Sequence, residues 1–179
     1  MKNIRIKNLT VRNFKGLKAF DLPLNGTHTA IHGTNATGKT TLFDAVSWLL
    51  FDKDSLNSSQ FEIKPLKDGE PVHNLETSVE ATFSDGETET ILKKVFVEKW
   101  TKKRGTASAE FTGHTTNHFI NGVPAKAKEY KAAVADICPD GLFLLLTNPR
   151  HFNSVMPWQD RRQTLLDICG DVTDQDVIN

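Results

Sequence analysis

The segment Gly33-Thr34-Asn35-Ala36-Thr37-Gly38-Lys39-Thr40 constrains this chain more than any other part of its sequence. It matches the pattern G-x-x-x-x-G-K-[S/T] at every fixed position. The two glycines let the backbone curl so that successive N–H groups point inward, toward the oxygens of a phosphate. A helix that begins at the lysine adds its positive dipole end at the same place. The segment therefore predicts a phosphate-binding loop (a P-loop, or Walker A motif) in an α/β fold.

The loop residues have distinct expected roles toward ATP and Mg²⁺, the ligands we predict. Lys39 is the candidate catalytic residue, because its ammonium would bridge the β- and γ-phosphates. The Thr40 hydroxyl is a candidate magnesium ligand, and Thr41 would contact the α-phosphate. The other residues expected to bind phosphate, largely through their backbone, are Gly33, Asn35, Ala36, Thr37 and Gly38.

The sequence around the loop predicts alternating strands and a helix. Apolar residues recur at helical spacing after the loop, at Leu42, Ala45, Val46, Leu49 and Leu50. Before the loop, apolar alternation predicts a strand over about 4–11 and another over 19–24, the second closed by an Asn-Gly turn. We also expect a short, unusually polar strand over 27–32, because such a loop normally follows a strand.

Beyond residue 51 the pattern changes to a polar loop over 52–75 and then to clear β alternation. Turns at Asp85-Gly86, 103–105 and Asn121-Gly122 predict an antiparallel meander over 76–123. The remaining elements are a helix over 127–137, an apolar run over 142–146 and a helix from Pro157 to just before Gly170. Thr173, Asp174 and Asp176 have the composition of a further capped helix start, which indicates that a longer protein continues here.

Charge and apolar content exclude some classes of protein. Lys and Arg number 22, as do Asp and Glu, so any contact with DNA depends on local patches and not on net charge. No apolar run reaches the roughly 20 residues needed to span a bilayer. The two cysteines lack the paired spacing of a metal site. We expect a cytoplasmic protein without a membrane partner.

A complete ATP hydrolase of this type also needs an acidic pair after an apolar strand, to hold magnesium and polarise the attacking water. No stretch of four apolar residues is followed by Asp-Glu. Asp136 and Asp167 follow apolar residues, but both lie in helical patterns. The sequence thus predicts phosphate binding without the whole hydrolytic machinery.

Three runs, 11–16, 31–41 and 42–46, together resemble the N-terminal half of an SbcC/SMC/RecF-type ATPase head of the phage or bacterial kind used in DNA repair and recombination. Such heads open with a strand and an Asn-Phe-basic-Gly turn, followed by the phosphate loop and an L-x-D-A-[I/V] helix start. Transporter ATPases of the ABC class share the loop but not usually the Asp-Ala step, here Asp44-Ala45. The stretch 143–170 resembles the end of the SbcC N-terminal lobe.

The resemblance implies a P-loop N-lobe of the ABC/SMC-head type with an antiparallel β subdomain. The whole of 1–179 would be one lobe, with a core at 1–51, the meander at 76–123 and a helical part at 125–179 leading toward a coiled coil. A C-terminal lobe would supply the signature loop and the acidic pair, so the intact protein would be an ATPase while the isolated chain binds ATP without hydrolysing it. A second head, a nuclease subunit and double-stranded DNA would be the other partners.

The resemblance also implies further site residues. Arg12, Asn13 and Lys15 of the first turn would lie near the nucleotide and help to hold its phosphates or base. The family's magnesium-contacting glutamine falls here on Thr147 or Asn148, which makes Asn148 a candidate second magnesium ligand.

Two other functions remain open at this level: a nucleotide-gated interaction module that does not hydrolyse ATP, and another P-loop enzyme such as a small-molecule kinase. A basic hairpin tip (Lys99, Lys102, Lys103 and Arg104, around Trp100) is either a DNA contact or, as we favour, a solvated edge. We expect Trp48, Trp100 and Trp158 to pack in the core or between lobes.

Overall fold

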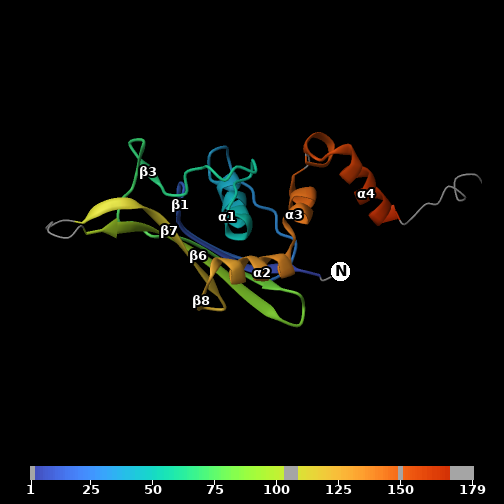
Figure 1. The fold of residues 1–179 in the computed structure, drawn as a ribbon, viewed down its shortest axis with the longest axis horizontal. Coiled ribbons are helices and arrows are strands. Elements are labelled where there is room, and N and C mark those ends of the chain that lie inside the picture. Colours follow the sequence, from blue (N-terminus) through green and yellow to red (C-terminus); the bar gives the residue numbers. More distant parts are fainter. Residues whose placement is uncertain (1–2, 103–108, 149–150, 170–179) are drawn as a thin grey trace, which may run out of the picture. The chain divides into compact units, whose positions relative to one another are not determined.

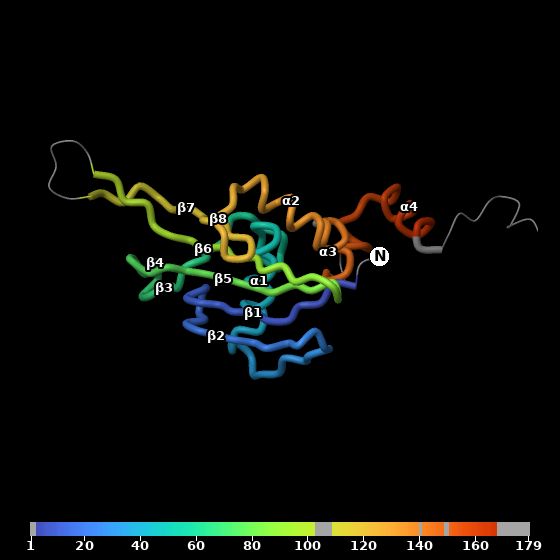
Figure 2. Tube along the Cα trace, turned by 90° about the horizontal axis from the view of Figure 1, so that it is seen from below, coloured from blue at the N-terminus to red at the C-terminus, as the bar shows by residue number. Residues whose placement is uncertain are grey.

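The computed structural model of the chain describes residues 3–102, 109–148 and 151–169. The chain divides into two compact units, Met1–Ile137 and Cys138–Asn179. In the first unit, antiparallel pairing builds a six-stranded sheet in the order β2-β1-β5-β6-β7-β8, which Figure 2 shows strand by strand. Its strands are β1 (Arg5–Phe14), β2 (Leu17–Pro23), β5 (Thr77–Ser84), β6 (Glu89–Thr101), β7 (Glu110–Ile120) and β8 (Val123–Ala125).

The predicted meander is confirmed, and it continues into the N-terminal strands. β1 pairs with β5 in antiparallel register, with Leu9 opposite Ala81 and Val11 opposite Val79. These four side chains are buried, because alternate residues of both strands face the same side of the sheet. The N-terminal strands and the meander therefore share one core.

Helix α1 (Lys39–Phe51) covers one face of this sheet (Figure 1). The predicted apolar face of α1 is largely confirmed, since Leu42, Ala45, Leu49 and Leu50 are buried and Val46 is half-buried. Trp48 is buried too, with its ring 5.6 Å from that of Phe14. Helix α2 (Ala127–Ile137) packs beside it, because the buried Tyr130 hydroxyl donates a 3.0 Å hydrogen bond to the Leu49 carbonyl.

The segment predicted as a polar loop over 52–75 contains a small hairpin, β3 (Leu66–Lys67) and β4 (Glu70–Pro71). In the second unit the apolar run forms helix α3 (Asp140–Thr147), followed by a one-turn π-helical segment η1 (His151–Val155) and helix α4 (Trp158–Cys169). The predicted helix after Pro157 is thereby confirmed. None of the helices in the described ranges is both long and apolar enough to cross a membrane.

The strand predicted over 27–32 was wrong. This segment is extended and exposed, and it pairs with no strand among the described residues. A strand needs a neighbour to accept its backbone hydrogen bonds, and this polar stretch has little apolar surface with which to pack. The expected core position of two tryptophans was also wrong: Trp100 and Trp158 are 42% and 63% exposed. The turn at 103–105 and the helix start at 173–176 lie outside the described residues.

Candidate nucleotide-phosphate site

Close contacts inside the phosphate loop explain both of its glycines. A Cβ on Gly33 would lie 2.7 Å from the Thr37 hydroxyl, which itself donates a 2.8 Å hydrogen bond to the Thr34 carbonyl. Gly38 has a φ of 94°, a left-handed conformation that side chains rarely adopt, and a Cβ there would lie 3.0 Å from a methyl of Leu17. The loop can therefore take this curled shape only with glycine at both positions.

The start of α1 is available to an anion. Gly38 is its N-cap, no side chain of the described residues caps it, and its first turn contains no acidic residue. The first N–H groups of a helix have no partner within the helix and carry its positive dipole end. These groups meet the loop at the point where a phosphate binds in P-loop proteins.

The Lys39 ammonium lies back over the loop. Its Nζ donates to the Gly33 carbonyl at 2.7 Å and to the Thr34 carbonyl at 2.6 Å. Because the side chain is exposed and flexible, the same ammonium can exchange these neutral acceptors for phosphate oxygens, which form stronger charge-assisted hydrogen bonds.

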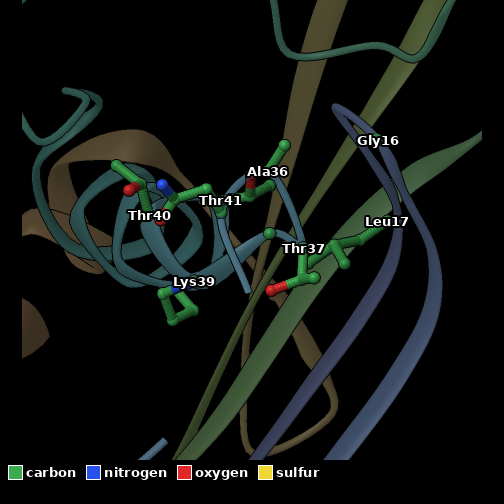
Figure 3. A pocket seen from close by; sticks show the side chains of 9 residues that line it. Gly16, Leu17, Ala36, Thr37, Lys39, Thr40 and Thr41 are labelled. Carbon is green, nitrogen blue, oxygen red and sulfur yellow. The ribbon is translucent and has the colours of Figure 1, made fainter. Parts of the chain in front are cut away.

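The loop and the start of α1 border a cavity of about 440 Å³ (Figure 3), within the usual range for ligand pockets. In Figure 3, Gly16 and Leu17 lie on one side of it and Lys39, Thr40 and Thr41 on the other. The residues that line it are Gly16, Leu17, Asn35, Ala36, Thr37, Gly38, Lys39, Thr40 and Thr41. All but the first two were predicted from the loop motif.

The donor set of this cavity fits a nucleotide phosphate chain. Three threonine hydroxyls, one ammonium and the loop backbone line it, all of which bind phosphate oxygens in proteins. None of these nine residues, all within the described chain, is acidic. The Thr40 hydroxyl thus fits one side of a magnesium ion, while the carboxylates that complete a hydrolytic site are not among the lining residues.

The three basic and polar residues predicted in the first turn have other partners. The Arg12 guanidinium donates two 2.8 Å hydrogen bonds to the Asp21 carboxylate, whose pKa it lowers through these bonds. Asn13 donates from its amide to the Glu76 carbonyl at 2.9 Å. The Lys15 ammonium lies 2.7 Å from the Asp44 carboxylate. Contact of these residues with a nucleotide stays a prediction.

Comparison with known proteins assigns the chain to a family. A model of the AAA domain matches residues 8–154, most of the chain. The chain belongs to the AAA domain family. This AAA domain also has structural relatives among SMC and RecF proteins, and its fold is that of the N-terminal region of an SMC/RecF-type P-loop ATPase head.

Three solved structures illustrate that fold. A chain from a structural study of ATP-driven dimerization and DNA-stimulated activation of SMC ATPases aligns with a TM-score of 0.62 at 22% identity, over 92% of this chain and 99% of that one. An SMC head bound to the C-terminal winged-helix domain of ScpA gives 0.63 at 22%, over 93% and 51%. The recombination mediator RecF with ATP gives 0.50 at 20%, over 97% and 40%. This chain spans about half or less of the last two.

Two polar clusters of this AAA domain were not predicted. Asp44 entered the sequence analysis only as a family marker, yet its 6% exposed side chain accepts hydrogen bonds from Lys15 and from the Ser55 N–H at 2.8 Å. Burial raises the pKa of Asp44, but these bonds outweigh it and lower the pKa. No local sequence signal pairs residues so far apart.

The second cluster centres on Glu98 of β6, whose side chain is 4% exposed. Its carboxylate accepts hydrogen bonds from the buried Lys64 ammonium, the Asn74 N–H at 3.0 Å and the Trp100 indole N–H at 3.0 Å, and it contacts His73 Nδ1 at 2.9 Å. The indole hydrogen bond explains how Trp100 is anchored although its ring is exposed.

Two predicted sites remain untested. Asn148 belongs to the second unit, where its N–H caps α3 by donating to the Leu144 carbonyl at 3.0 Å. Its role as a magnesium ligand stays a prediction. Lys99 and Lys102 of the basic hairpin are exposed, while Lys103 and Arg104 lie outside the described residues.

Proposed function

We propose that this chain is the ATP-binding N-terminal half of a cytoplasmic SbcC/SMC-like ATPase that acts in DNA double-strand-break repair, recombination or end processing. The observation that carries the proposal is the cavity at the start of α1, with Lys39, Thr40 and Thr41 beside the curled loop. The AAA domain family and the SMC/RecF-like fold support the same function.

In this proposal the chain binds and orients the nucleotide. The loop N–H groups and the N-terminus of α1 hold the phosphates, Lys39 neutralises charge between the β- and γ-phosphates, and Thr40 holds one side of Mg²⁺. Magnesium supplies charge neutralisation at the phosphates. Because the lining residues include no carboxylate, nothing among them accepts a proton from an attacking water, and the isolated chain does not turn ATP over.

The proposed partners are a C-terminal lobe, a second head, a nuclease subunit and double-stranded DNA. The exposed, extended segment at 27–32 supports the first of these, because its backbone groups are available for a strand from another lobe. So does the length of the SMC head and RecF chains, of which this chain spans 51% and 40%.

The test measures binding and turnover of Mg-ATP by the purified chain, by Lys39→Ala and by Lys93→Ala, a matched change of a lysine on β6 away from the cavity. We expect ATP binding by the unaltered chain and by Lys93→Ala, strongly weakened binding by Lys39→Ala, and no turnover in any of them. Adding the C-terminal lobe should produce turnover that duplex DNA changes.

Two results would contradict the proposal. Turnover by the chain alone that disappears in Lys39→Ala would mean that it carries its own acidic and water-orienting residues. Failure of the unaltered chain to bind ATP would remove the nucleotide site altogether. ATP-dependent association without turnover, even with the C-terminal lobe present, would instead favour the nucleotide-gated interaction module.

A further inference from the structure

The turn between β1 and β2 has an unfavourable backbone that its surroundings hold in place. Asn13 and Lys15 have φ values of 50° and 48°, in the left-handed region that non-glycine residues rarely occupy. The Lys15 N–H donates to the Ile63 carbonyl at 2.8 Å, and the Asn13 carbonyl accepts from the Thr77 hydroxyl at 2.9 Å. A strained turn that several neighbours constrain is often part of a functional site.

The Lys15 side chain ties this turn to the helix of the phosphate site. Its ammonium lies 2.7 Å from Asp44, which stands one helical turn after Thr40 on α1, and 4.8 Å from the centre of the Phe61 ring. The Lys15 side chain is 26% exposed and that of Asp44 only 6%. If Lys15 moved onto a phosphate, Asp44 would lose its cation and remain as a buried charge, which is strongly unfavourable.

The two residues that follow Lys15 form a wall of the phosphate cavity. Leu17 lies directly over Gly38 of the loop, as the 3.0 Å approach to its Cβ position shows. A Cβ on Gly16 would meet no atom of the described residues within 4 Å, and the Gly16 φ lies outside the left-handed region. Neither its backbone nor packing within the described chain therefore requires a glycine at 16. A side chain there would enter space at the edge of the cavity.

We infer that the turn Lys15–Leu17 is a wall of the nucleoside triphosphate site, in which Gly16 leaves room for close approach of the nucleotide and Lys15 is a positioning residue that acts through Asp44. This inference rests on the proposed function and deepens it. It assigns Lys15 a role other than direct contact with phosphate, and it adds Gly16 and Leu17 to the site.

A double-mutant cycle separates positioning from direct contact. The affinity of a fluorescent ATP analogue with Mg²⁺ is measured for the unaltered chain, Lys15→Met, Asp44→Asn, the double variant and Lys15→Arg. If the pair positions the turn, each single change and the double change weaken binding by a similar factor, about tenfold, and Lys15→Arg retains most of the affinity. If Lys15 is a phosphate ligand, Lys15→Met weakens binding while Asp44→Asn leaves it unchanged or tightens it, which would overturn the inference.

The exposed ion pair between Lys93 and Glu80 provides the matched control. It joins β6 to β5 at 3.5 Å and does not line the cavity, so Lys93→Met and Glu80→Gln should leave the affinity unchanged. Urea unfolding of every variant shows whether it is folded at the temperature of the binding measurement.

Gly16→Ala tests the wall without touching the ion pair. We expect its urea unfolding midpoint to be unchanged or raised, because alanine restricts the unfolded chain and meets open space in the fold. Its affinity for ATP should fall about tenfold or more. Unchanged affinity would refute close approach at Gly16. If the unaltered chain does not bind ATP, or Lys39→Ala binds it equally well, the proposed function and this inference both fail. Lys39-dependent binding that ignores the turn variants overturns only the inference.

Discussion

Replacing the buried Lys94 by methionine should stabilise this protein, although Lys94 makes several favourable contacts. Lys94 extends from β6 to the C-terminal end of α1, and its side chain is only 1% exposed. Its ammonium donates to the Trp48 carbonyl at 2.8 Å and to Asp52 at 2.6 Å, and it lies 5.6 Å and 5.3 Å from the rings of Trp48 and Tyr130.

The opposing contribution is desolvation. Burial lowers the pKa of Lys94 even though Asp52 favours the charged form, so the ammonium is less favourable in the fold than in water. Methionine has a similar shape without the charge. The Asp52 side chain is 48% exposed and regains water, and the Trp48 carbonyl still accepts the Asp52 N–H at 3.1 Å. No buried charge is left unpaired.

The two effects set the magnitude. Apolar replacement of a buried ion pair commonly stabilises by about 1–4 kcal/mol. The two cation–π contacts that are lost are worth about 0.5–1 kcal/mol each. We therefore expect Lys94→Met to raise the free energy of unfolding by about 1 kcal/mol. Asp52→Asn leaves Lys94 buried without its counter-charge and should lower that free energy by about 2 kcal/mol, less than for a fully buried pair because the Trp48 carbonyl remains bonded.

Urea unfolding at pH 7 measures both variants, provided that the denaturant dependence stays the same. The pH dependence provides a second check. Because the pKa of Lys94 is lowered in the fold, the unfolded chain retains this proton up to about pH 10.5 while the folded protein releases it earlier. The unaltered protein should thus become more stable as the pH rises toward 10.5, and its difference from Lys94→Met should shrink. A Lys94→Met variant that loses more than about 1 kcal/mol at pH 7 would refute this reasoning.

The remaining predictions concern the loop, the hairpin and the first turn. Gly38→Ala should lower the free energy of unfolding by about 1–2 kcal/mol in urea titration and weaken ATP binding, because the φ of 94° and the Leu17 methyl both oppose a side chain; an unchanged midpoint would contradict it. Burial raises the pKa of Glu98, but hydrogen bonds to its carboxylate outweigh this and lower it from 4.5 to about 2. The stability that Glu98 contributes should be complete above about pH 5.5 and fall as the pH drops through 4.5 toward 2, and acid titration of Glu98→Gln should lack this component. Arg12→Met should change the free energy of unfolding by less than about 1 kcal/mol in urea titration, because Arg12 and Asp21 form a solvent-exposed pair; a larger loss would assign Arg12 a structural role.

The elements that follow from short-range patterns were predictable. The phosphate loop is specified by fixed residue types within eight positions, and the helix after it by apolar residues at helical spacing. The meander follows from period-2 alternation and Gly-containing turns, and its strands β5 to β8 lie close to the predicted positions. In each case the information is local, because backbone conformation and one-sided burial repeat within a few residues.

The strand expected at 27–32 shows where local reasoning ends. The motif requires a connection into the loop, but whether that connection is a strand depends on a neighbouring strand, which the described part of the chain does not provide. The exposure of Trp100 and Trp158 is of the same kind, since an aromatic residue is buried only where another element covers it.

The sequence by itself determined that this chain binds phosphate at Gly33–Thr41, which residues do so, and which helix presents them. Only the tertiary structure decided that Gly16 and Leu17 complete the wall of that cavity and that Lys15 pairs with Asp44, 29 positions away. Such contacts depend on which strands and helices become neighbours. That choice is made by burying apolar surface over the whole unit, and no local pattern of residues encodes it.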